Sequence, residues 1–208
     1  MSIDLKRIKS FKQWSTDKML VIHMETPFLD VETCLKMTGI PFKSILYNSS
    51  DFLELFNKGI KESIGIIITG SRKKGKELPH LNIGINDLPM LGMCYGNEWL
   101  AYYLGCNIVD CNHPIGEHSE VEAILYNSLL FNGISDKETI VTMAHDYMIG
   151  ELGPGCEKIA STNLTPIAGF QNIERGIFGL QFHPEKGYLG EIIFRNFYRF
   201  CLKSKYHL

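Results

Sequence analysis

Short apolar runs that alternate with helix-like segments constrain the fold of this chain more than any other feature of its sequence. Met19–His23, Ile64–Thr69 and Met90–Met93 have the length and character of strands buried on both faces. Helix-like segments occupy Val31–Met37 and Asp51–Lys58 between the first two runs. Apolar strands separated by helices are typical of βαβ crossovers, which build a parallel sheet covered by helices. We therefore expect a three-layer α/β fold with a mostly parallel central sheet flanked by helices.

In the second half of the chain, strands no longer alternate with helices. Short strand candidates follow one another there with little helix between them. Such a series predicts extra antiparallel strands. Asn172–Gly176 has the asparagine and glycine of a tight reversal, so we expect it to join the last two strands. The chain closes with a helical pattern over Glu191–Leu202. The strand candidates are Glu120–Leu125, Thr139–Met143, Glu157–Ser161, Ile167–Phe170 and Gly176–Phe182.

Length, charge and cysteine usage narrow the class of protein. The 208 residues fit one domain, 1–208, in which residues 1–18 form an N-terminal packing arm with helix-like apolar spacing. The formal net charge is −2, so no basic surface for nucleic acid is expected. No apolar run approaches the roughly 18 residues that span a bilayer, so no membrane association is expected either. The 6 scattered cysteines favour reduced thiols and a cytoplasmic location.

The segment that runs from Pro89 to Ala101 carries the clearest chemical signal. An apolar strand leads into Gly92-Met-Cys-Tyr-Gly96 and then into a helix, which is a glycine-flanked turn with cysteine at its centre. A sharp strand-to-helix turn crowds the backbone, so small residues are needed two positions to either side of the nucleophile. The N-terminus of the helix favours a thiolate and offers amides to an oxyanion. Cys94 is therefore the candidate nucleophile, and the alternative is a structural cysteine between packing glycines.

A second segment supplies the candidate base and its partner. Gly179-Leu-Gln-Phe-His-Pro-Glu185 ends a strand candidate with a histidine and an acid two residues apart. Strand alternation predicts that the His183 and Glu185 side chains lie on the same side. Glu185 would then orient the imidazole, while His183 would take the thiol proton and return it to a leaving amine. By itself, His-Pro-Glu is also an ordinary turn sequence.

Together these two motifs resemble those of class I glutamine amidotransferases, the glutaminase domains or subunits that release ammonia for a synthetase. The resemblance extends from the strand at Met19 to the terminal helix. His183-Pro-Glu-Lys186 resembles the glutaminase subunit of imidazole glycerol phosphate synthase, whereas several other segments favour the GMP synthetase branch, to which the chain is nearest. Those segments are Tyr126–Phe131, Met143–His145, Ile159–Thr162 and Pro166–Ala168.

The resemblance also assigns residues around the nucleophile. The family's oxyanion hole implies roles for the backbone amides of Gly70 and Tyr95, although the usual Gly-Gly-Pro loop is replaced by Thr69-Gly70-Ser71. The usual glutamine four residues after the nucleophile is Glu98 here, and an acid there would repel a carboxylate substrate unless it is protonated, or would favour an amine. His145 and Asp146 are candidate substrate contacts, and a structural histidine is the alternative for His145.

Two other clusters do not lead to a firm site. Cys106, Cys111, His113 and His118 lack the spacing of a familiar zinc module, so no metal and no cofactor are expected. The cationic loop at residues 72–76 is either a solvated loop or an anion-binding element.

These observations predict a cysteine-dependent glutaminase that hydrolyses a γ-glutamyl amide through an acyl-enzyme. The chain lacks a Gly-x-x-x-x-Gly-Lys-Ser/Thr loop, so an ATP-using synthetase that receives the ammonia would be a separate partner. One alternative is a self-standing γ-glutamyl amide or peptide hydrolase, which Glu98 favours. The other is a catalytically degraded interaction subunit, which the altered oxyanion loop favours.

Overall fold

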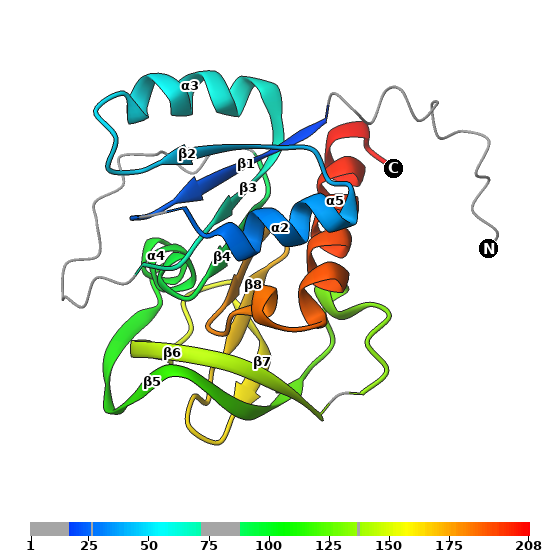
Figure 1. The fold of residues 1–208 in the computed structure, drawn as a ribbon. Helices are drawn as coiled ribbons and strands as arrows, with labels where there is room; N and C mark the ends of the chain where they lie inside the picture. Colours follow the sequence, from blue (N-terminus) through cyan, green and yellow to red (C-terminus); the bar gives the residue numbers. More distant parts are fainter. Residues whose placement is uncertain (1–16, 26, 72–87, 137) are drawn as a thin grey trace.

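The computed structural model describes residues 17–25, 27–71, 88–136 and 138–208, without the side chains of residues 112–118 and 138. Residues 1–16 of the expected N-terminal arm (1–18) and the cationic loop at 72–76 therefore lie outside the described residues. The described chain forms one sheet of 9 strands in the order β2-β1-β3-β4-β9-β8-β7-β5-β6, flanked by helices (Figure 1). No helix among these residues has the length and hydropathy needed to cross a bilayer.

The first five strands in this order are parallel, as the apolar runs predicted. β2 is the exception to the prediction, because no strand was expected there. Its Lys43 and Ser44 interrupt the apolar pattern, which an edge strand tolerates because only one side of it is paired. The parallel strands are β1 (Lys18–His23), β2 (Phe42–Leu46), β3 (Ser63–Ile68), β4 (Met90–Met93) and β9 (Ile177–Leu180).

The remaining strands are antiparallel, which confirms the expected change in the second half. Two of them are much longer than the sequence pattern indicated, since their register shifts interrupt the alternation of apolar and polar residues. Asn172–Gly176 does join the last two strands, and Gly176 has a φ of 65° there. The antiparallel strands are β5 (Asn107–Leu125), β6 (Glu138–Glu151), β7 (Glu157–Thr162) and β8 (Gly169–Asn172).

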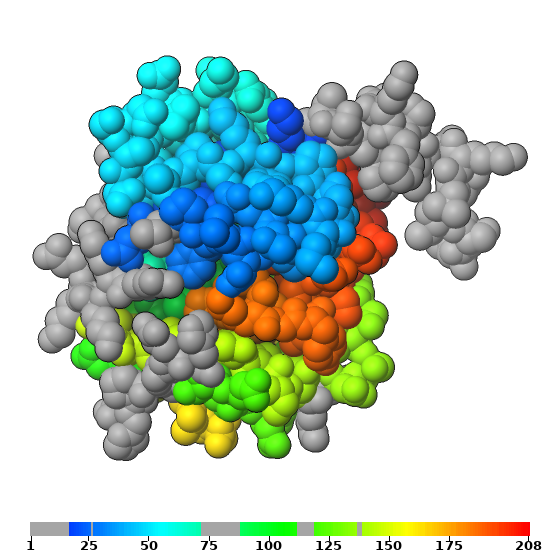
Figure 2. Space-filling view, viewed as in Figure 1, coloured from blue at the N-terminus to red at the C-terminus, as the bar shows by residue number. Residues whose placement is uncertain are grey.

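Helices cover both faces of the sheet and complete the three layers. In β1, Met19 and Val21 belong to the core under α2 and α5, whereas Leu20 and Ile22 belong to the core under α3 and α4. This alternation explains why the strand is apolar along its whole length. Figure 2 shows the described N-terminal segments in blue meeting the segment before the C-terminal helix in orange on one face. The helices are α2 (Leu29–Thr38), α3 (Phe52–Glu62), α4 (Tyr95–Tyr103) and α5 (Leu189–Tyr206).

The parallel strands bring distant parts of the chain to one edge. β3, β4 and β9 are neighbours that run in the same direction, so the residues after their carboxyl ends lie close together. Gly70 follows β3, Cys94 follows β4, and His183 follows β9. Carboxyl ends of parallel strands are where α/β proteins commonly bind ligands.

Candidate active site

Cys94 occupies a strained turn between β4 and α4. Its φ of 52° and ψ of −112° lie outside the favoured regions, and His207 is the other non-glycine residue with positive φ in the described chain. A Cβ on Gly92 would overlap the carbonyl oxygen of Gly96, and one on Gly96 would overlap that of Ile68. The two glycines therefore let the strand and the helix approach closely enough to make the turn.

The Cys94 sulfur lies among groups from three other segments. Sγ is 3.3 Å from the carbonyl oxygen of Ala144 in β6, within reach of a weak S–H···O hydrogen bond. The imidazole of His183 hydrogen-bonds to the same sulfur. A Cβ built on Gly70 would lie 3.6 Å from Sγ and 3.4 Å from Cε1 of His183. The fold thus brings Gly70, Cys94 and His183 into one contact group.

Glu185 holds the other side of the imidazole. Nδ1 of His183 donates to Oε1 of Glu185 at 2.8 Å, and the Glu185 side chain is only 1% exposed. Burial alone would lower the pKa of His183, but the hydrogen bonds and charges of Cys94 and Glu185 raise it to about 10. The imidazole therefore carries a positive charge near pH 7.

The expected reason for this pairing was wrong, although the pair itself is present. His183 and Glu185 do not alternate along a strand, because Pro184–Lys186 forms a 3₁₀ turn. The turn brings the acid back to the imidazole, while the backbone N–H of His183 donates to the carbonyl oxygen of Thr142 in β6. The antiparallel half of the sheet thus fixes the backbone of the histidine.

Glu98 lies one helical turn after Cys94 and belongs to a buried hydrogen-bonded chain. Asn97 Nδ2 donates to Gln181 Oε1 at 2.8 Å, and Gln181 Nε2 donates to Glu98 Oε1 at 2.9 Å. Burial raises the pKa of Glu98 to about 8, the Gln181 hydrogen bond acts in the opposite direction, and the charge of Asp146 adds to the rise. Of the alternatives expected for this acid, the protonated form therefore predominates at neutral pH, and in that form it does not repel a carboxylate.

We predict that Glu98→Gln changes how stability depends on pH. The folded-state pKa lies above the ordinary 4.5, so the wild-type protein binds an extra proton on folding between about pH 4.5 and 8 and loses stability as pH rises through that window. The isosteric amide has no such proton. The variant should therefore gain stability relative to wild type, by roughly 2–4 kcal/mol between pH 5 and pH 8.5. Urea unfolding at both pH values measures this difference, and parallel pH profiles for the two proteins would contradict it.

The two predicted substrate contacts on β6 differ in accessibility. His145 is buried and uses both ring nitrogens within the protein: Nδ1 lies 2.9 Å from the Tyr147 carbonyl oxygen, and Nε2 lies 3.2 Å from Thr165 Oγ1. Burial lowers its pKa to about 4. These contacts favour the structural alternative for His145. Asp146 is half-buried, and its charge acts on Glu98.

A second thiol–imidazole contact lies beside this site. Cys111 Sγ is 3.4 Å from His145 Nδ1. Burial raises the pKa of the Cys111 thiol to about 11, and the pKa of His145 is low, so at neutral pH this contact joins a thiol to a neutral imidazole. It therefore lacks the ionised pair expected of a cysteine nucleophile. No group of three or more metal-ligating side chains occurs among the described residues, which do not include those of His113 and His118.

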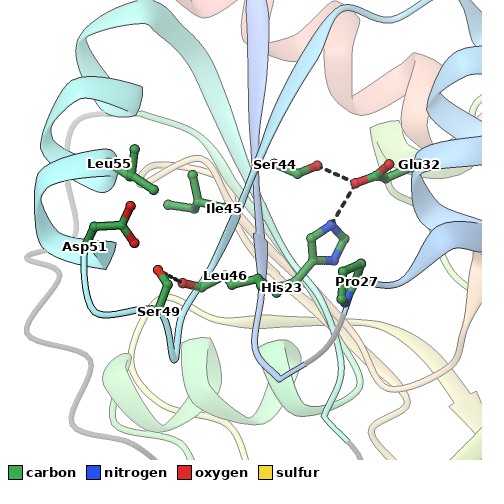
Figure 3. A pocket seen from close by; sticks show the side chains of 9 residues that line it. All are labelled: His23, Pro27, Glu32, Ser44, Ile45, Leu46, Ser49, Asp51 and Leu55. Carbon is green, nitrogen blue, oxygen red and sulfur yellow. Dashed lines mark hydrogen bonds and ion pairs between the residues drawn. The ribbon is translucent and has the colours of Figure 1, made fainter.

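A separate cavity of about 310 Å³ opens at the ends of β1 and β2 beside α3 (Figure 3). At its wall, Ser44 Oγ donates to Glu32 Oε1 at 2.7 Å, and His23 Nε2 lies 3.2 Å from the same oxygen. The other nitrogen of His23 accepts from the backbone N–H of Phe28, whose ring stacks parallel to that of His183 with centroids 6.5 Å apart. Cys94 does not line this cavity, and the network is linked to His183 through the Phe28 ring.

Sequence reasoning did not assign roles to Gln181 and Phe28. Gln181 is completely buried between Leu180 and Phe182, and a polar residue inside an apolar strand is the signal that could have identified it. Phe28 had no comparable signal, because its contact with His183 joins residues far apart in the chain.

The chain is similar in sequence to known proteins. Residues 32–199 match the family described as glutamine amidotransferase class-I. The GMP synthase (glutamine-hydrolyzing) of Clostridium perfringens is 38% identical over 149 residues, which are 68% of this chain and 29% of that protein. The GMP synthase of Clostridium acetobutylicum is 33% identical over 149 residues, with the same two shares. The chain thus spans less than a third of the length of these relatives.

Two solved structures share the fold. A Thermoplasma acidophilum protein described as a GMP synthase subunit superposes with a TM-score of 0.76 at 23% identity, over 92% of this chain and 97% of that one. A glutamine amidotransferase from Thermotoga maritima gives a TM-score of 0.67 at 17% identity, over 92% and 86%. Since the family match covers most of the chain and both segments that meet at the thiol, this protein belongs to the class-I glutamine amidotransferase family.

Proposed function

We propose that the chain is a glutaminase subunit that hydrolyses the γ-amide of glutamine and passes the ammonia to a separate synthetase of the GMP synthase type. The observation that carries this proposal is the contact group at the thiol: the Cys94 sulfur bonds to an imidazole whose other nitrogen is held by a buried acid. The relatives named GMP synthase support the direction of ammonia transfer.

In the proposed reaction, the Cys94 thiolate attacks the γ-carbonyl carbon, and the carbonyl oxygen takes up negative charge. Gly70 lies against the sulfur and Tyr95 begins α4, so their backbone amides are the proposed oxyanion donors. Glu185 occupies Nδ1 of His183, which leaves Nε2 to protonate the leaving nitrogen as the C–N bond breaks. Ammonia leaves, and a γ-glutamyl thioester remains on Cys94.

Water then resolves the thioester. His183 removes a proton from the water as its oxygen attacks the thioester carbonyl, and the C–S bond breaks to release glutamate and the thiolate. Each turnover therefore consumes one glutamine and one water and yields one glutamate and one ammonia. Glu185 does not transfer a proton in this scheme, because it orients the ring and stabilises the imidazolium form.

The test is to measure glutamate and ammonia released from glutamine by the purified chain, alone and with a GMP synthase-type synthetase. We expect equal amounts of the two products and a higher rate with the partner, because contacts with the synthetase would fix the geometry of the proposed oxyanion donors. A self-standing γ-glutamyl hydrolase, which the acid at position 98 favours, would instead prefer γ-glutamyl peptides without a partner. A chain that releases glutamate from none of these compounds would support the non-catalytic alternative.

A further inference from the structure

The imidazole of His183 is held by two hydrogen bonds that lie near the plane of its ring. Nδ1 donates to Oε1 of Glu185 at 2.8 Å, and the Cys94 sulfur bonds to the ring on its other side. These bonds fix directions within the plane. They leave the ring free to tilt about the line that joins the sulfur to the carboxylate, so a group against a face of the ring is needed to oppose that tilt.

The ring of Phe28 lies against a face of this imidazole. The two rings are nearly parallel, with an interplanar angle of 9° and centroids 6.5 Å apart, which is the arrangement of an offset stack. The His183 side chain is 10% exposed. Phe28 therefore restricts the tilt that the bonds within the plane leave open.

The backbone of Phe28 is fixed by hydrogen bonds on both sides of its Cα. Its carbonyl oxygen accepts from the N–H of Val31 at 3.1 Å and from that of Glu32 at 3.3 Å, which ties it to the first turn of α2. Its own N–H donates to Nδ1 of His23 at 3.1 Å. The place of the Phe28 ring thus depends on α2 and on the histidine that ends β1.

His23 accepts this bond because its proton is on the other nitrogen. Nε2 lies 3.2 Å from Oε1 of Glu32, and Oγ of Ser44 donates to the same oxygen at 2.7 Å (Figure 3). The carboxylate accepts the Nε2–H and leaves the lone pair of Nδ1 for the Phe28 N–H. Burial lowers the pKa of His23, so its ring is neutral near pH 7.

We propose that Phe28 is a positioning residue that keeps the His183 imidazole aligned with the reacting atoms, and that His23 fixes Phe28 through its backbone N–H. The inference rests on the proposed glutaminase function, in which this imidazole protonates the leaving nitrogen and later takes a proton from water. Both transfers need the N–H direction to point at the reacting atom, because a misaligned hydrogen bond is weak. Neither Phe28 nor His23 exchanges a proton with the substrate in this role.

The first experiment compares Phe28→Leu with Phe28→Tyr, since leucine keeps apolar bulk without a flat ring, whereas tyrosine keeps the ring. Titration with a glutamine-mimicking electrophile counts the reactive Cys94 sites, so that kcat is expressed per reactive site. We expect Phe28→Leu to lower kcat for glutamine about tenfold or more, with KM changed less than about twofold. Phe28→Tyr should keep kcat within about twofold of wild type. Fewer reactive sites with an unchanged kcat per site would indicate a merely structural role and overturn the proposal.

Phe42→Leu is the matched control. Phe42 is also half-buried and packs against the same core as Phe28, but it begins β2, and the ammonium group of Lys36 lies over its ring. This variant should keep the wild-type kcat per site. An equal fall in Phe42→Leu and Phe28→Leu would contradict the proposal, because it would reflect general loosening of the core.

A double-mutant cycle tests the link from His23 to Phe28. His23→Leu removes the acceptor of the Phe28 N–H and should lower kcat per site. Since this effect acts through the Phe28 ring, His23→Leu/Phe28→Leu should fall no more than about twofold below the slower single variant. His23→Asn, whose amide oxygen can accept the same bond, should be faster than His23→Leu. Losses that multiply in the double variant would refute the role of His23.

A measurement without turnover separates this inference from the proposed function. The rate at which iodoacetamide alkylates Cys94, followed by peptide mass spectrometry from pH 4 to pH 9, reports the thiolate that the imidazolium of His183 stabilises. In Phe28→Leu, the pH of half-maximal alkylation should rise by about 0.5–1 unit relative to wild type and Phe28→Tyr. That shift would support the positioning role even if the wild-type chain released no glutamate. Identical alkylation profiles in the three proteins would overturn it.

Discussion

Cys94→Ala is expected to lower glutamate release from glutamine by about 10⁴-fold or more, because no other group in the proposed mechanism forms the thioester. The fold should persist, since alanine occupies the same backbone position and the glycines that make the turn are unchanged. Enzyme assay together with circular dichroism and urea unfolding distinguishes lost chemistry from lost structure.

Labelling identifies the nucleophile independently of turnover. A glutamine-mimicking electrophile should modify Cys94 alone among the 6 thiols, as read by peptide mass spectrometry. Cys111→Ser is the matched control, because Cys111 also touches a histidine but has its pKa raised to about 11. Labelling that survives in Cys94→Ala, or that disappears in Cys111→Ser, would contradict the assignment of Cys94 as the nucleophile.

The second large effect is expected at His183 and Glu185, and the two should differ. His183→Ala removes the group that moves both protons, so kcat should fall by about 10³-fold or more. Glu185→Gln keeps an oxygen acceptor for Nδ1 but removes the charge that stabilises the imidazolium, and a fall of roughly 10²-fold is expected. Steady-state kinetics of the two variants beside wild type measures the order.

The pH dependence of stability tests whether Glu185 stabilises the positive charge on the imidazole of His183. The pKa of His183 is raised from 6.5 to about 10, so the stability contributed by its partners is complete below pH 6.5 and is lost as pH rises through about 10. Glu185→Gln should therefore destabilise the protein at pH 7 and lose most of that effect above pH 10. A variant as active and as stable as wild type at pH 7 would exclude the proposed role of Glu185.

Local sequence patterns predicted the elements that depend on local physical chemistry. The apolar runs at Met19–His23 and Met90–Met93 became strands buried between two helical layers, because a wholly apolar strand is stable only when both of its faces are covered. The glycines at 92 and 96 predicted the turn at Cys94, since the overlap that a side chain would cause there involves nearby backbone. β2 was missed because an edge strand keeps polar residues.

The charge states around the thiol were decided by the tertiary structure. Glu98 acquires its neutral form from burial and from the charge of Asp146 on a different part of the sheet, while the hydrogen bond from Gln181, a residue 83 positions away, acts in the opposite direction. A carboxyl group in the sequence has no fixed pKa until such neighbours and the loss of water are specified.

The sequence by itself determined that Cys94 follows a buried strand and that His183 and Glu185 are close in the chain. Only the tertiary structure decided that β4 and β9 are neighbours, that Phe28 stacks on His183, and that a 3₁₀ turn joins Glu185 to the imidazole. The physical reason is the sequence separation over which each effect acts. Turn sterics and apolar periodicity depend on residues that are close in the chain. Desolvation and side-chain contacts depend on which distant segments the folded sheet brings together.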